Sequence, residues 1–327
     1  MIKIIFNTLL GIVLIVIWAQ FVNIGQIMQT ISKVNLLGLL PVFFFMIISL
    51  VLRAVRLQLF LSEIKKIKLL DLIYLNGAAM ILNFFIPIRM GEIAKGVYLN
   101  QRYDLNLGKS IIWIFLDRFV DFLGVLLFCA TLLLVIPTNL PAQFAISVAL
   151  IFSIALVVTY LAVFKVEYSK KLVNFLMPLL IVKSIKIYFG RVSCFILDAF
   201  SVLNRHPKDL LKMIVITILA YGADGAIWYF TFISLGSYQD FLKMYLGQGL
   251  SALTYLVPAA PGYVGSAEAS GALILSGAFG IETNLASAMV VLFHILSAIF
   301  VIIFGLISIF SLKLDLGVIF KKALKRR

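Results

Sequence analysis

The feature that most constrains this chain is a series of long apolar runs. Each approaches the ~20 residues that an α-helix needs to cross a hydrocarbon core ~30 Å thick. A spanning segment must satisfy its own backbone polar groups, and continuous rather than alternating apolarity excludes a transmembrane β-barrel. The chain is therefore predicted to be an all-α, polytopic integral membrane bundle. The runs are Ile4–Val22, Leu36–Leu52, Ser110–Ile136, Ala142–Phe164, Leu210–Leu235 and Leu285–Leu312.

Composition points the same way. Of the 327 residues, 63% are hydrophobic and 13% are charged, against roughly 45–50% and about 25% in soluble domains. The net charge of +14 is typical of loops at an anionic membrane face, so no nucleic-acid partner is expected. The 2 cysteines and 2 histidines form no ligand cluster, so the sequence predicts no disulfide framework, no metal and no cofactor.

The first apolar run differs from a secretory signal peptide. Ile4–Val22 is longer than the apolar core of a signal peptide, and no small-residue cleavage site follows it. We expect it to be an uncleaved first span.

Two other apolar stretches are broken by proline. Leu72–Pro87 ends at its proline, and Phe241–Gly280 is interrupted by Pro258 and Pro261. Proline removes a backbone donor and clashes with the preceding helical turn, so a helix must break at these points.

Charge decides how the broken stretches are threaded. If each enters and leaves on the same side, every lysine and arginine except Lys33, Arg118 and Lys243 lies on one side of the membrane. A full crossing by Leu72–Pro87 would instead divide similar basic loops between the two sides. The positive-inside rule therefore favours two re-entrant hairpins, a multi-pass protein of the inner (plasma) membrane and cytoplasmic termini.

This threading predicts one transmembrane domain, 1–327, with about six full spans and two re-entrant broken-helix hairpins. The two halves have the same order of parts with reversed sense, as in the inverted repeats of secondary transporters. The expected parts are a first span (1–35), a first half (36–136), a connecting span (142–164), a cytoplasmic or interfacial segment (165–209), a second half (210–312) and a basic cytoplasmic tail (313–327).

Residues 165–209 are basic and discontinuously apolar. Leu172–Val182 is too short to span, and apolar residues from Ile185 to Leu203 recur at helical spacing. This pattern indicates amphipathic helices in the inner interface, with lysines toward anionic headgroups. A small cytoplasmic helical hairpin that packs on the bundle is the alternative.

Charged residues follow the first break. Arg89, Glu92 and Lys95 are spaced three apart, so they share one face of the half-helix expected after Pro87. Backbone N–H groups at a helix start bind anions, which predicts that Arg89 grips a lipid phosphate here, with Glu92 and Lys95 beside it. The alternative is an interfacial turn whose charged side chains reach water.

A second set of charges lies inside the span Ser110–Ile136. Asp117 and Asp121 are one turn apart and flank Arg118, and Asp121 lies roughly 18 Å deep at 1.5 Å per residue. Ionised groups at that depth need a polar cavity or a buried partner. The alternative to a transport site is a purely structural salt bridge from Arg118 to Asp121 or Glu92.

The second break carries the third candidate set. Irregular backbone in a bilayer is tolerated only against protein or a water-filled cavity. Ser266 can cap the half-helix that follows the break, and Glu268 lies in its first turn. Asp224, in another span, is expected to pair with Arg118 or a nearby lysine or tyrosine, or to carry a proton, and His294 to be a hydrogen-bonded packing residue. The residues of the break itself are Pro258, Pro261, Gly262 and Gly265.

These motifs, in this order, resemble the flippase-like integral membrane family whose best-known member is the membrane module of lysylphosphatidylglycerol synthase, the bacterial multiple peptide resistance factor. The family more often has Glu-Arg where Asp117-Arg118 stands, which keeps the charge. The resemblance covers nearly the whole chain, and its most specific element is the last. The matching elements are Pro87-x-Arg89-x-Gly91-Glu92, Asp117-Arg118-x-x-Asp121-x-x-Gly124 and Pro258-x-x-Pro261-Gly262-x-x-Gly265-x-x-Glu268.

The resemblance implies a lipid-translocating bundle with Arg89, Glu92, Arg118, Asp121 and Glu268 near the substrate path. The expected substrate is an anionic, aminoacylated or polyprenyl-phosphate-linked lipid moved between leaflets through a midplane polar site. The soluble transferase domain of the synthase is not expected here, so the chain is predicted not to be an enzyme. It contains no Walker-type motif, so we expect ion-coupled or downhill transport.

Two other functions stay open at this point. A non-catalytic membrane subunit could present lipid to a separate soluble or membrane synthase or glycosyltransferase, with 165–212 as the docking surface. An integral membrane transferase would need Glu92 and Glu268 as its acid and base, with no nucleophile or metal ligands beside them.

Overall fold

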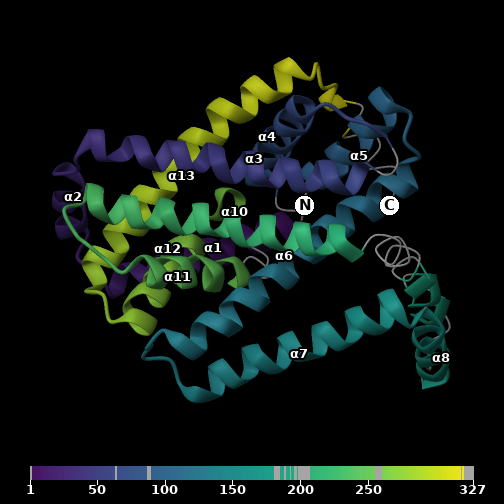
Figure 1. Ribbon diagram of the computed structural model, residues 1–327. Coiled ribbons are helices and arrows are strands. Elements are labelled where there is room, and N and C mark those ends of the chain that lie inside the picture. Colours follow the sequence, from purple (N-terminus) through teal and green to yellow (C-terminus); the bar gives the residue numbers. More distant parts are fainter. Residues whose placement is uncertain are drawn as a thin grey trace.

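The computed structural model describes residues 2–62, 65–86, 90–179, 185–187, 189–191, 193–194, 197, 207–254, 260–317 and 319. Throughout these residues the regular structure is helical (Figure 1). Five helices are long and apolar enough to cross a membrane, and a sixth span is counted if the bent pair at the N-terminus is one span. The all-α polytopic bundle is thereby confirmed.

Five long helices form the frame of the bundle. Four of them agree with the predicted spans to within one turn. The exception is α3 (Leu40–Ser62), and the four that agree are α6 (Leu107–Val135), α7 (Ala142–Phe164), α10 (Pro207–Ser234) and α13 (Thr283–Ser311).

The predicted end of the second span at Leu52 is wrong. A 3-10 turn, η1 (Leu36–Leu39), leads into α3, which continues to Ser62. Arg53 and Arg56 therefore lie inside this helix rather than in a loop, and Arg56 is buried. Both arginines form ion pairs with carboxylates on other helices, and the apolar pattern of the run alone does not reveal those partners.

The first span also differs from its prediction. The helix α1 (Ile2–Gln20) ends before Val22, and the chain bends by 88° into α2 (Ile24–Ser32). Asn23 stabilises the start of α2, because its side chain accepts a hydrogen bond from the Gln26 N–H at 3.1 Å.

The first broken stretch forms an antiparallel hairpin of α4 (Leu69–Phe85) and α5 (Met90–Tyr103). Asp71 near the start of α4 accepts a hydrogen bond from Tyr103 at the end of α5. Near the tip, Gly91 packs so tightly against the Ala79 backbone that a Cβ atom would not fit. Both open ends therefore lie at the same end of the molecule.

The second broken stretch also turns back on itself. It contains α11 (Phe241–Thr254), the 3-10 turn η3 (Pro261–Tyr263), α12 (Ser266–Leu273) and the π-helical turn η4 (Ile274–Ala278). Gly247 of α11 packs against Phe279, just beyond η4, so the outgoing and returning arms lie side by side.

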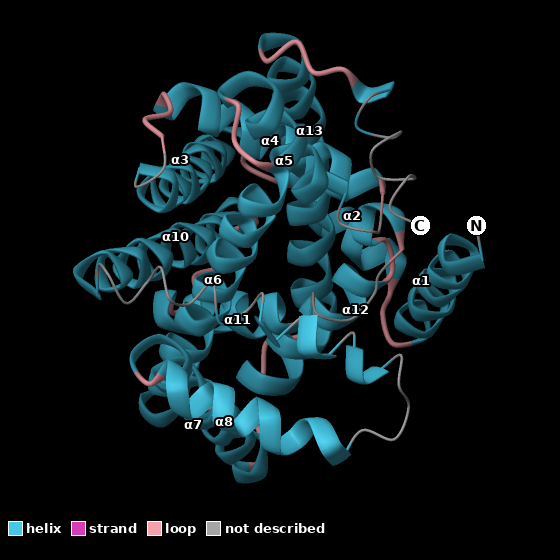
Figure 2. Ribbon diagram, turned by 90° about the vertical axis from the view of Figure 1, so that its right-hand side faces the viewer, coloured by secondary structure: helices cyan, strands magenta, loops and turns pink. Residues whose placement is uncertain are grey.

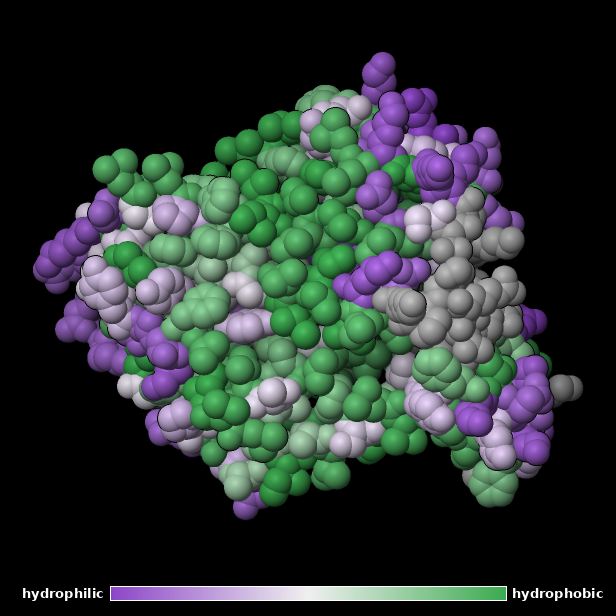
Figure 3. All heavy atoms as spheres, viewed as in Figure 1, coloured by the Kyte–Doolittle hydropathy of each residue, from purple (hydrophilic) through white to green (hydrophobic). Residues whose placement is uncertain are grey.

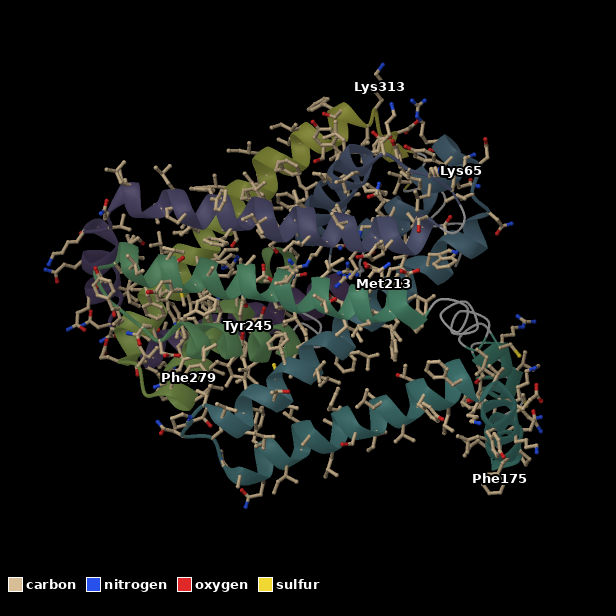
Figure 4. The ribbon with its side chains drawn as sticks, viewed as in Figure 1. Lys65, Phe175, Met213, Tyr245, Phe279 and Lys313 are labelled. Atoms are coloured by element: carbon tan, nitrogen blue, oxygen red, sulfur yellow. The ribbon has the colours of Figure 1, made fainter. Side chains whose placement is uncertain are left out.

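The two hairpins open toward opposite ends of the bundle. Lys65, just before α4, lies at the same end as Lys313, whereas Phe279 lies toward the other end (Figure 4). That second end also holds the start of α3 (Figure 1). There the Asn35 N–H donates to the Ser234 carbonyl at the end of α10 at 2.8 Å. This arrangement agrees with the re-entrant threading, while the inverted repeat itself and the division into halves stay predictions.

The tips of the two hairpins meet inside the bundle. Phe84, at the end of α4, lies 6.5 Å from Tyr263 of η3 and 6.4 Å from His294 of α13, measured between ring centroids. From the other side, Gly11 of α1 packs directly on Gly265. The second tip is thus enclosed by α1, α4 and α13.

The outer surface suits a lipid environment. A broad hydrophobic belt separates hydrophilic residues at the two ends of the molecule (Figure 3). At the edge of the bundle lies α7, apart from α3 and α4 in both ribbon views (Figures 1 and 2). Only 11% of its apolar stretch is buried inside the protein, so most of this helix lies on the outer surface.

The segment 165–209 is described only in part. It begins with α8 (Val166–Leu176) and the 3-10 turn η2 (Met177–Leu179), which matches the prediction of short helices rather than a span. Ser169 is buried, whereas Tyr168, Lys170 and Lys171 are exposed. Much of the predicted helix from 185 to 203 lies outside the described residues.

A labelling experiment tests the first hairpin. In a Cys194→Ser background, single cysteines at Lys66 and Gln101, both exposed, should react with an impermeant maleimide from the same side of a sealed vesicle. A cysteine at Tyr238, which is 80% exposed near the start of α11, should react only from the opposite side. Labelling of Lys66→Cys and Gln101→Cys from opposite sides would show that α4 crosses the membrane.

A stability measurement tests the packing of the second tip. Gly265 has φ +80°, and a Cβ atom there would strike the Gly11 backbone. We expect Gly265→Ala to destabilise the protein by at least ~2 kcal/mol, from left-handed strain and the backbone clash together. Thermal unfolding in detergent measures this, with Gly222→Ala, which meets no atom within 4 Å, as the control. Equal stability of the two variants would contradict the close α1–tip contact.

Candidate functional site

The most buried charge in the described part of the chain is Arg56 of α3, whose side chain has 0% exposure. Its Nε donates to Asp117 at 2.8 Å, and its Nη1 donates to Asp121 and to the Thr217 hydroxyl, the latter at 2.8 Å. Asp117 and Asp121 belong to α6, and Thr217 belongs to α10. One guanidinium therefore joins α3, α6 and α10.

Arg118 approaches the same carboxylates from α6. Its Nη2 donates to Asp117 at 2.6 Å, and its Nη1 lies 3.6 Å from Asp121. Asp117 is thus shared by two arginines, Arg56 and Arg118. Arg118 differs from Arg56 in that 31% of its side chain is exposed.

A second ion pair extends this group along α3 and α10. Arg53 Nη2 donates to Asp224 at 2.6 Å, and the Ser49 hydroxyl donates to the other Asp224 oxygen at 2.6 Å. The Arg53 guanidinium also lies 5.1 Å from the centre of the Tyr221 ring. Tyr221 in turn donates to Asp121 at 3.4 Å, so it connects the two ion pairs.

The first hairpin supplies the remaining charges. Lys95 and Glu92 of α5 form an ion pair at 3.4 Å, and Lys95 is buried. Glu92 also lies within electrostatic range of Arg118. We call these residues together the charged cluster. Its members are Arg53, Arg56, Glu92, Lys95, Asp117, Arg118, Asp121 and Asp224.

Within the charged cluster some polar atoms lack a hydrogen-bond partner. Arg56 Nη2 and Arg118 Nε are both buried without one, whereas Glu92 Oε2 faces Lys95 Nζ at 3.4 Å. Buried polar groups in proteins are normally satisfied, and an unsatisfied one costs about 1–3 kcal/mol or more when it is charged. The charged cluster therefore has two arginine donors left over for a further polar group.

Glu268 belongs to a separate polar group at the second tip. Its Oε1 is hydrogen-bonded to His294 Nδ1, and its Oε2 accepts from the Gly265 N–H at 2.8 Å. His294 Nε2 contacts the Gly262 carbonyl at 2.7 Å. Two successive residues of this turn, Gly262 and Tyr263, have positive φ, at +69° and +59°. Left-handed backbone at a non-glycine residue is uncommon and requires surrounding contacts to hold it.

The structure thus divides the predicted site residues between two places. Glu92, Arg118, Asp121 and the supporting residues Asp117, Lys95 and Asp224 lie in the charged cluster. Glu268, Gly262 and Gly265 lie at the second tip, with Pro261 in η3 and Ser266 at the start of α12. Phe84 lies at the tip between the hairpins. Arg89 and Pro258 lie outside the described residues.

Some predicted partners were wrong. Asp224 pairs with Arg53 rather than with Arg118. The Ser266 hydroxyl donates to the Tyr263 carbonyl at 2.9 Å instead of capping α12, whose first turn is held by Glu268. His294 is hydrogen-bonded as predicted, and one of its partners is Glu268.

Sequence reasoning missed Arg53, Arg56 and His294 as parts of these sites. For Arg53 and Arg56 a signal was present: they are three residues apart on an apolar run and therefore lie on one helical face. For His294 the chain offers no local signal, because its partners lie in the loop and helix of the preceding hairpin.

Comparison with known proteins agrees with the resemblance seen in the motifs. No match was found among the curated proteins or the solved structures. A family model described as the lysylphosphatidylglycerol synthase TM region matches residues 4–305. Since this match spans most of the chain, the protein belongs to the lysylphosphatidylglycerol synthase transmembrane-region family.

Proposed function

We propose that this protein is a flippase-like transporter that moves an anionic, aminoacylated or polyprenyl-phosphate-linked lipid between leaflets. The observation that carries the proposal is the charged cluster with its unpartnered polar atoms, held by helices whose outer faces are apolar. An ionised headgroup in hydrocarbon costs several kcal/mol, and a transporter must offset that cost along the path.

The charged cluster has the composition for such an exchange. Its cations Arg53, Arg56, Lys95 and Arg118 stand against an equal number of carboxylates. A lipid phosphate that binds Arg118 takes the place of one of the carboxylates now paired with this arginine. The ammonium group of an aminoacylated lipid can then pair with the displaced carboxylate. With an aminoacylated lipid, an internal ion pair is then replaced by one with the headgroup and no charge is left alone. With a purely anionic lipid, Asp117 keeps Arg56 as its partner.

Arg118 is the member placed to make this exchange. It combines a partly exposed side chain with an unpartnered Nε atom, and its partner Asp117 keeps a second cation in Arg56. Arginine binds phosphate oxygens with two parallel hydrogen bonds, which favours it over lysine for this role. We therefore assign the headgroup phosphate to Arg118, and on the sequence motif alone we propose Arg89 as a second ligand of that phosphate.

The second candidate function rests on α8. This helix carries exposed Lys170, which pairs with Glu167, and exposed Lys171, and it contacts α7. A basic surface of this kind suits the docking of an acidic soluble partner, as a subunit that presents lipid to a separate synthase would need. A docking subunit needs no lipid exchange of its own, which separates the two functions.

Lipid exchange in vesicles tests the proposal. Purified protein reconstituted with fluorescent anionic phospholipid should move inner-leaflet label to the outer leaflet, where a membrane-impermeant quencher removes its fluorescence. Arg118→Gln should slow this exchange about tenfold or more, because a charge-assisted hydrogen bond contributes ~1.5–3 kcal/mol. Arg102→Gln, the same substitution at an exposed residue of α5, is the matched control and should exchange at the wild-type rate.

Folding of the variants is checked by thermal unfolding and gel filtration. Wild-type protein without exchange activity, together with co-purification of a synthase whose activity requires α8, would favour the docking function. Equal exchange rates in Arg118→Gln and Arg102→Gln would remove the charged cluster from the transport path.

A further inference from the structure

The hydrogen bonds of His294 determine how many protons its site holds. The Gly262 carbonyl can only accept, so His294 Nε2, at 2.7 Å from it, carries a hydrogen. Nδ1 faces Glu268 Oε1, and two lone pairs would repel each other there, so a hydrogen lies between these atoms. Whichever atom owns it, the pair holds one proton more than a neutral imidazole and a carboxylate.

The surroundings give this proton a large electrostatic effect. The Glu268 and His294 side chains are only 9% and 15% exposed. With the proton the pair is neutral overall, and without it a net negative charge is left in a poorly hydrated site. Such a charge is costly without a compensating cation.

The neighbouring elements offer Glu268 no other cation within the described residues. Tyr263 is the titratable group that lies beside the pair on the tip. From α4 the contact is Phe84, and the Thr8–Gln20 part of α1 has no charged residue. On α10 the charged residue in the middle of the helix is Asp224, which is paired with Arg53. On α11 the charged residue is Lys243, which lies in the first turn of the helix and is exposed.

The pair also determines the position of the second tip. Glu268 holds the Gly265 N–H, and His294 holds the Gly262 carbonyl, so both sides of the turn are fastened to α12 and α13. The turn contains the left-handed residues Gly262 and Tyr263, whose strain the fastening must offset. Removal of the proton breaks the Glu268–His294 hydrogen bond, so the Gly265 side of the turn is no longer linked to α13.

We infer that Glu268 and His294 form a proton-binding site that fastens the second tip to α13, and that this proton is the one exchanged during lipid movement. The inference rests on the proposed function for its second part. In the charged cluster, Asp117, Asp121 and Asp224 are held by arginines, which do not release protons in proteins, so these three are unsuited to the same role. The fourth carboxylate, Glu92, is paired with Lys95.

The pair contacts the first hairpin through Phe84, whose ring lies against His294 and Tyr263. Phe84 follows Asn83, whose side chain accepts from the Gly91 N–H at 2.8 Å, directly before Glu92. The Glu268–His294 bond is therefore linked through Phe84 and Asn83 to the start of α5, which carries part of the charged cluster.

Nuclear magnetic resonance of the imidazole tests the first part. The chain has 2 histidines, so protein labelled with ¹⁵N-histidine in a His206→Gln background gives signals of His294 alone. At neutral pH we expect both ring nitrogens to show hydrogen-bonded signatures and to change together when the pair titrates. Glu268→Gln should convert His294 to a neutral ring without that titration, while the amide still bridges Gly265 and Nδ1. A free Nδ1 lone pair in the wild type would overturn the proposal.

A pH gradient across reconstituted vesicles tests the second part. With one proton exchanged per lipid, a gradient of one pH unit should drive the labelled lipid to about a tenfold leaflet asymmetry, because one pH unit is a tenfold difference in proton activity. Glu268→Gln and His294→Gln should abolish this asymmetry. The same substitution at the other histidine, His206→Gln, should retain it.

The outcomes separate this inference from the proposed function. Rapid exchange by the wild type with no asymmetry under the gradient would overturn the proton linkage and leave lipid transport in place. Asymmetry that persists in Glu268→Gln would also overturn it. If the wild type moves no lipid, the proposed function and the linkage to lipid movement both fail, and the resonance experiment still decides whether the pair binds the proton.

Discussion

The ion pairs of Arg56 are the interaction on which the rest of the bundle depends. A guanidinium with no exposure in an apolar bundle is tolerated only because carboxylates and a hydroxyl from two other helices surround it. Loss of one member of a buried pair costs about 3–5 kcal/mol, because the other charge is left alone. This penalty holds α3, α6 and α10 in one register. It also bears on the role proposed for Arg118, because Asp117 would keep Arg56 as a partner if Arg118 bound a lipid phosphate.

The hairpins could be predicted because their causes are local. Proline ends a helix wherever it stands, and a bilayer does not tolerate free backbone polar groups, so Pro87 and Pro261 mark the turns without knowledge of their neighbours. The distribution of lysine and arginine then favoured one threading over the other. The bend after α1 contains no proline, and its local signal is Asn23, a common helix-capping residue that begins α2.

The partners could not be predicted because they are distant in sequence. Arg56 and Asp121 are 65 positions apart, and Arg53 and Asp224 are 171 apart. From the apolar pattern alone, Arg53 and Arg56 mark the end of a span, and only the positions of α6 and α10 turn them into interior residues. His294 is similar, since a single histidine on an apolar helix has the same pattern whether it packs or binds a proton. The apolar pattern therefore predicts where helices lie, whereas charge pairing decides which charged residues lie inside.

The contact between the hairpins connects the two polar sites physically. Gly91 allows α5 to pack on the Ala79 backbone without any intervening side chain, so α4 and α5 are expected to move as one body. Phe84, at the end of that body, lies against the strained turn of the second hairpin. Packed interfaces of this kind shift between discrete arrangements rather than deform continuously. We therefore expect a change in the fastening of the second turn to displace α4 and α5 together, and with them Glu92 and Lys95, which lie beside Arg118, the residue that we propose binds the lipid phosphate.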